Sequence, residues 1–120
     1  MSQQLLFVCR HSPYGGSNAR EGLDAILASA AYGQDIGVLF IDDGVFQLLP
    51  DQAPASLPQK NLSANLSALP LYEVERIYVH SESLRERGVP FDSLTLEGLQ
   101  AVNSHEVGVL LSGHEQLLSF

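Results

Sequence analysis

The sequence predicts a single α/β domain, a three-layer sandwich of about five mainly parallel strands with helices on both faces. Short runs of consecutive apolar residues recur along the chain, which is typical of strands buried on both faces of a parallel sheet. Segments with apolar residues at spacings of three and four, typical of amphipathic helices, separate these runs. The chain of 120 residues, 45% of them hydrophobic, fits one domain, residues 1–120, with a core of its own.

The first apolar run, residues 5–9, predicts a buried strand. Residues 11–17 have the composition of a loop, and Asn18 with Glu21 has the spacing of a capping box. The helix that follows should end near Gly33, because glycine is the preferred residue just past a helix end. A buried strand is thus followed by an amphipathic helix.

The same unit then repeats. Residues 36–41 form the second apolar run, and residues 42–44 (DDG) are a turn signal that ends it. Residues 45–49 (VFQLL) predict a single helical turn. A proline-punctuated loop at 51–59 precedes leucines at helical spacing over 62–69, which predict a helix of two to three turns.

Residues 76–80 (RIYVH) are rich in strand-forming side chains and predict the third strand. Either Ser81 or Ser83 can start the next helix, and Ser83 has Glu86 at capping-box spacing. Residues 94–96 are a shorter candidate strand that could also open a helix.

The end of the chain predicts one more helix and one more strand. Asn103 with Glu106 is a second capping box, and Gly113 is a natural stop for the helix that it begins. Residues 116–120 then close the chain as the last strand.

In parallel α/β folds of the flavodoxin and Rossmann type, the functional crevice lies beyond the carboxyl ends of the strands, where the strand order reverses. A flavodoxin-like order of 2-1-3-4-5 would place that point between the first and third strands. The loop at His11 would then lie near the loop at His80. The two histidines are therefore candidate crevice residues and candidate neighbours.

The net charge of the chain argues against some classes of function. The chain carries 14 acidic and 6 basic residues, a formal charge of -8, and such a surface repels phosphate backbones, so direct nucleic-acid binding is not expected. No apolar stretch approaches the length of a membrane span, and the default location is the cytoplasm. The single cysteine cannot form an internal disulfide, which agrees with a reducing compartment.

The candidate reactive residues each have an ordinary interpretation as well. His11 and His80 can serve as bases or hydrogen-bond donors, or can be satisfied by local backbone, and no metal-ligand spacing supports a two-histidine metal site. Cys9 lies inside an apolar run, where a thiol is usually buried and inert. The DDG turn at 42–44 and the glycines before the first helix are only weak signals for a metal or a phosphate. No catalytic residue, metal or cofactor is predicted.

Two surface features suggest partners. Arg85, in the Arg-Glu-Arg sequence after the third strand, is either a solvated charge or an anchor for an acidic partner beside the crevice. The apolar turn at 45–49 is part core and part candidate subunit interface, because its side chains cannot all face inward. The candidate interface residues are Val45, Phe46, Leu48 and Leu49.

Three motifs, in this order, resemble the sulfur-relay proteins of the DsrE/DsrF/DsrH family, and most closely its DsrF-like branch. They are REGLDA at 20–25, FIDDGVFQLLP at 40–50 and SLRERG at 83–88. The similarity covers essentially the whole chain.

The resemblance implies a subunit of a TusBCD-type heterohexamer, with TusB-like and TusD-like subunits as partners. Such a complex takes persulfide sulfur from a TusA-like carrier and passes it to a TusE-like carrier for 2-thiouridine formation at the tRNA wobble position. In the family the persulfide cysteine of the TusD-like subunit lies eight residues before an Arg-Gly element. Counting back eight from Gly88 reaches His80, so a non-catalytic structural role is expected here.

Other functions also fit the sequence. The chain could belong to a DsrEFH-type sulfur-oxidation complex, act alone through Cys9 with His11 as base, or bind a small anion or nucleotide in the crevice. The sequence also leaves open a homo-oligomer when the chain is isolated.

Overall fold

The computed structural model describes residues 4–13, 17–49, 66–94 and 96–120. Five strands form one parallel sheet in the order β4-β3-β2-β1-β5. The strands are β1 (Gln4–Cys9), β2 (Asp35–Phe40), β3 (Arg76–His80), β4 (Leu99–Val102) and β5 (Gln116–Ser119). The helices are α1 (Asn18–Ala31), α3 (Ser81–Glu86) and α4 (Ser104–Gly113), with the 3-10 helices η1 (Asp42–Leu48), η2 (Leu69–Tyr72) and η3 (Phe91–Ser93).

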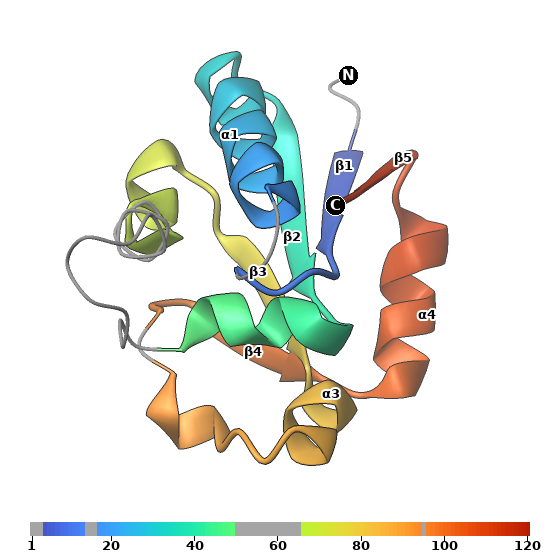
Figure 1. Ribbon diagram of the computed structural model, residues 1–120. Helices are drawn as coiled ribbons and strands as arrows, with labels where there is room; N and C mark the ends of the chain where they lie inside the picture. The colour runs from blue at the N-terminus through green and yellow to red at the C-terminus, as the bar shows by residue number, and fades with distance from the viewer. Residues whose placement is uncertain (1–3, 14–16, 50–65, 95) are drawn as a thin grey trace, which may run out of the picture.

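Helices cover both faces of the sheet, as predicted (Figure 1). On one face, Phe7 of β1 packs in the larger core with residues of α1, η1, η2 and α3. On the other face, Leu6 and Leu39 pack with Val107 of α4 in a smaller core. Because successive side chains of a strand point to opposite faces, β1 and β2 contribute to both cores. Their continuous apolar runs follow from this double burial.

The strand order differs from the flavodoxin-like order of 2-1-3-4-5. Each strand from β1 to β4 lies next to the previous one, and only β5 returns to the other side of β1. The connections from β1 to β2 and from β2 to β3 therefore progress in one direction across the sheet. As a result, β2 lies between the first and third strands and separates the two loops that were expected to be neighbours.

Two local predictions are wrong for identifiable reasons. The N-cap residue of α1 is Ser17, which makes no side-chain hydrogen bond to the helix backbone, so Asn18 lies inside the helix and does not form a capping box with Glu21. The fourth strand is Leu99–Val102 instead of residues 94–96. Leu94 and Leu96 pack on the larger core from outside the sheet, and the left-handed turn at Gly98 precedes the strand.

Other local predictions are confirmed. Residues 76–80 form β3, and α3 begins at Ser81, with His80 as its N-cap and Ser83 inside the helix. Asn103 and Glu106 form a complete capping box at the start of α4, which ends at Gly113. The loop at 51–59 and most of the predicted helix at 62–69 lie outside the described residues; Leu66 and Leu69 are buried.

Gly44 lets η1 lie against the end of β1. A Cβ added there would be 1.8 Å from the carbonyl oxygen of Cys9, which is backbone and accepts a hydrogen bond from the amide of Ile41. Neither partner can move without disturbing the pairing of β1 and β2. The close approach fixes where the loop after β2 begins.

We expect Gly44→Ala to lower the free energy of unfolding by at least about 3 kcal/mol, because the added methyl group overpacks against backbone. Urea unfolding measures this. Gly108→Ala is the matched control: that position is helical and open, so the change should stabilise the protein by up to about 1 kcal/mol. Equal stabilities for Gly44→Ala and the native chain would contradict the close packing.

Candidate functional site

Polar side chains from several elements lie together at the carboxyl edge of the sheet, and this edge is the candidate site. Parallel α/β proteins bind ligands at this edge, because the loops after the strands converge there. Here Arg10 follows β1, Asp42 begins η1 after β2, His80 ends β3, and Ser104 begins α4 after β4.

His80 is at the centre of this cluster. It is the last residue of β3 and the N-cap of α3, and only 8% of it is exposed. Its ring lies between two hydroxyl groups: Nδ1 is 2.7 Å from Ser83 Oγ and Nε2 is 2.8 Å from Ser104 Oγ. The ring therefore joins α3 to α4 from a buried position.

The hydrogen-bond directions around the ring follow from the number of available protons. The hydroxyl of Ser104 donates to Glu82 Oε2, so it must accept from His80 Nε2–H. The Asp42 amide donates to the hydroxyl of Ser83, which can in turn donate to Nδ1. This pattern assigns the Nε2–H tautomer to the neutral ring. Both ring nitrogens are already occupied by the protein's own side chains.

Ion pairs hold the surrounding loops to the same edge. Arg10, after β1, donates from Nε and Nη2 to Asp42 Oδ2, at 3.2 and 3.1 Å. Arg87, after α3, donates to Asp43 Oδ1 at 3.0 Å and to the carbonyl of Ser83. The DDG sequence was expected to form a turn before a helical turn at 45–49, but it is the first part of η1, and its two carboxylates bind two arginines. These pairs fix the loop after β2 relative to its neighbours.

His11 belongs to a different group. Its ring is exposed and its two nitrogens lie 3.4 Å from Asn18 Nδ2, while its carbonyl accepts from the buried side chain of Gln47. In the part of the chain that the structure describes, no hydrogen bond joins His11 to His80. The expectation that they are neighbours is wrong, because β2 lies between their strands.

Cys9 ends β1 in the larger core and is 3% exposed. Burial raises the pKa of its thiol to about 12, because the thiolate would lose its hydration. At neutral pH the sulfur is a protonated thiol, which is a poor nucleophile. The prediction that Cys9 is buried is confirmed, and its position does not favour chemistry with His11 as base.

The remaining predicted residues fall into two environments. Val45 and Leu48 are buried in the larger core, whereas Phe46 and Leu49 pack against it and stay partly exposed. Arg85 is exposed on α3. An interface formed by the 45–49 segment would therefore use Phe46 and Leu49.

The sequence did not reveal the partners of His80. Glu82 and Ser104 were not singled out, and Ser83 was considered only as a helix cap. The available signal was a hydroxyl or carboxylate just after the third and fourth strands, at the edge where those strands end. In the described parts of the chain, no group of three or more His, Cys, Asp and Glu side chains is arranged to hold a metal ion.

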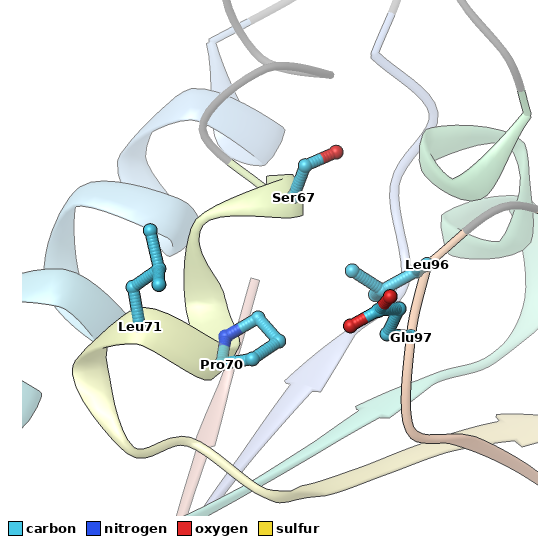
Figure 2. A pocket seen from close by; sticks show the side chains of 5 residues that line it. All are labelled: Ser67, Pro70, Leu71, Leu96 and Glu97. Atoms are coloured by element: carbon cyan, nitrogen blue, oxygen red, sulfur yellow. The ribbon is translucent and has the colours of Figure 1, made fainter.

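A hollow of about 380 Å³ lies elsewhere, between η2 and the segment before β4 (Figure 2). Figure 2 shows Pro70 on one side and Leu96 with Glu97 on the other. Ser67 and Leu71 complete the lining. Among the described residues, this lining carries one carboxylate, on Glu97, and one hydroxyl group, on Ser67.

Comparison with known protein families identifies the family of this chain. The profile of the DsrE/DsrF-like family matches residues 3–120. The chain belongs to the DsrE/DsrF-like family. "Protein TusC homolog" of Pseudomonas aeruginosa is 45% identical over 119 residues, covering 99% of each chain. "Protein TusC homolog" of Vibrio parahaemolyticus is 41% identical over 117 residues, covering 98% of each.

Solved structures share the fold of this DsrE/DsrF-like chain. The ychN protein from E. coli matches with a TM-score of 0.79 at 19% identity, covering 98% of this chain and 99% of that one. A protein of unknown function, MTH1491 from Methanobacterium thermoautotrophicum, matches with a TM-score of 0.71 at 20% identity, covering 99% and 100%. No helix among the described residues of this family member is both long and apolar enough to cross a membrane.

We expect Cys9 to react with iodoacetamide at pH 8 at least a hundredfold more slowly in the folded chain than in urea. A pKa of about 12 instead of 9.0 leaves about a thousandfold less thiolate at this pH, and burial blocks access as well. Intact mass measured over time gives both rates. Equal rates would contradict the buried position of the thiol.

We expect Ser104→Ala to lower the free energy of unfolding by about 1–2 kcal/mol, because His80 Nε2–H would lose its acceptor in a buried site. Ser112→Ala is the matched control on the same helix: its exposed hydroxyl donates only to the Val109 carbonyl, and the change should stay within about 0.5 kcal/mol. If the two variants were equally stable, the His80 hydrogen bonds would not hold α4.

Proposed function

We propose that this chain is a non-catalytic structural subunit of a TusBCD-type sulfur-relay heterohexamer in the cytoplasm. The observation that carries the proposal is the 45% identity, over nearly the whole of both chains, to a protein named TusC homolog. The complex would pass persulfide sulfur between protein carriers for 2-thiouridine formation at the tRNA wobble position. The acidic surface fits a subunit that contacts proteins upstream of the tRNA.

The non-catalytic role rests on the absence of a usable thiol. A persulfide forms on a thiolate that a donor can reach, and Cys9, the one cysteine of the sequence, is protonated and buried. By the spacing to Gly88 that the family resemblance implies, His80 takes the place of the persulfide cysteine of the TusD-like subunit. An imidazole cannot carry a persulfide, and both nitrogens of this one are hydrogen-bonded to serines.

The proposed partners are TusB-like and TusD-like subunits, with TusA-like and TusE-like carriers reaching the complex through them. Phe46 and Leu49 are the residues of the 45–49 segment that remain partly exposed to contact another subunit. Val45 and Leu48 would support that surface from the core. The chain would therefore contribute a shaped surface instead of a reacting atom.

Co-expression with the TusB-like and TusD-like chains of the same organism tests the assembly. We expect the three to co-purify, and Cys9→Ala to leave both assembly and sulfur transfer within about twofold of the native complex, because a buried thiol takes no part in transfer. The matched control replaces the persulfide cysteine of the TusD-like chain and should abolish transfer. A chain that never co-purifies would refute the structural role, and loss of transfer in assembled Cys9→Ala would refute the non-catalytic role.

A further inference from the structure

A hollow of about 440 Å³ opens at the outer edge of the sheet, between β4 and α3. It is separate from the hollow of Figure 2 and lies on the α3 side of β4. The residues that line it are Ser81, Leu84, Arg85, Gly88, Val89, Pro90, Phe91 and Ala101.

Residues at the periphery of the larger core line this edge hollow. Leu84 and Val89 are members of that core and are 3% and 8% exposed. Ala101 of β4 is paired in register with Val79, which also belongs to that core, so both side chains point to the same face of the sheet. Ala101 is nevertheless exposed. An apolar side chain placed in the hollow would therefore extend the core over β4.

The strand beside the hollow has a free edge. In the described part of the sheet, β4 pairs only with β3 and ends the strand order. The backbone of an edge strand can accept an added strand from another chain. Phe91, which is 41% exposed, stands at the rim and offers an aromatic contact.

The charge at the hollow is positive in an otherwise acidic chain. Arg10, Arg76 and Arg87 each hold a carboxylate of the protein. Arg85 differs: its guanidinium makes no hydrogen bond or ion pair within the described residues, although it lines the hollow. A carboxylate on the occupant would complete it, since arginine binds carboxylates with paired N–H groups.

We propose that the edge hollow binds an extended segment of a partner protein that pairs with β4, places an apolar side chain against Leu84 and Val89, and presents a carboxylate to Arg85. The free edge of β4 supplies backbone hydrogen bonds to the segment. The hollow favours an apolar side chain at one position, and Arg85 favours a negatively charged side chain beside it. This binding mode does not depend on the proposed role in sulfur relay.

A panel of labelled hexapeptides tests the proposal by fluorescence anisotropy with the full-length chain. All peptides have threonine and valine at the flanking positions, which favour an extended conformation. The two central positions vary. The first is leucine or serine, and the second is aspartate, asparagine or lysine. We expect the leucine-aspartate peptide to bind at least fivefold more tightly than the leucine-asparagine and serine-aspartate peptides.

Two variants locate the binding. Arg85→Glu should reverse the preference from aspartate to lysine, and Ala101→Leu should fill the hollow and weaken binding at least tenfold, while circular dichroism shows both still folded. Arg20→Glu is the matched control, because Arg20 pairs with Asp24 on α1, and it should keep the aspartate preference.

Three outcomes would overturn the proposal. One is that no peptide of the panel binds. Another is that aspartate is preferred equally in Arg85→Glu. The third is that the chain forms a dimer which Ala101→Leu disrupts and which the leucine-aspartate peptide does not dissociate. That result would identify a second copy of the chain as the occupant.

Discussion

The strands β1 and β2 are buried on both faces of the sheet, and this double burial determines where the helices pack. The two strands divide the apolar residues between two cores, and η1 packs so closely against the end of β1 that only glycine fits at position 44. Cys9 lies in this tightly packed region, and burial raises the pKa of its thiol to about 12. A thiol in that position stabilises the core and is removed from chemistry.

With the cysteine in the core, the polar side chains of the carboxyl edge serve to hold the loops together. His80 connects α3 and α4 through two hydroxyl groups, and two arginine-aspartate pairs fix the loop after β2. Among the described residues, both ring nitrogens of His80 and the carboxylates of Asp42 and Asp43 already have protein partners. Glu82 Oε2, 4.0 Å from His80 Nε2, also disfavours an anion there.

The features that the sequence predicted well are those decided by neighbouring residues. The strand at 76–80 and the capping box of Asn103 with Glu106 depend on contacts within one element, and both are confirmed. The order of the strands depends on how the helices that connect them pack on the sheet. A local sequence pattern does not predict this packing. The fourth strand was misplaced because an edge strand with exposed Gln100 and Ala101 lacks a continuous apolar run. The partners of His80 were missed because Ser104 approaches it from α4, 24 residues along the chain.

In the proposed role, this chain shapes a sulfur-relay complex without carrying sulfur itself. The most direct test of this role is intact mass spectrometry of each subunit after the assembled complex has been loaded with sulfur from a persulfide donor, without reductant. We expect the added mass of a sulfur atom on the TusD-like subunit and none on this chain, because Cys9 is buried and protonated and His80 cannot hold sulfur. Sulfur added to this chain, and lost again on reduction, would show that the chain carries sulfur.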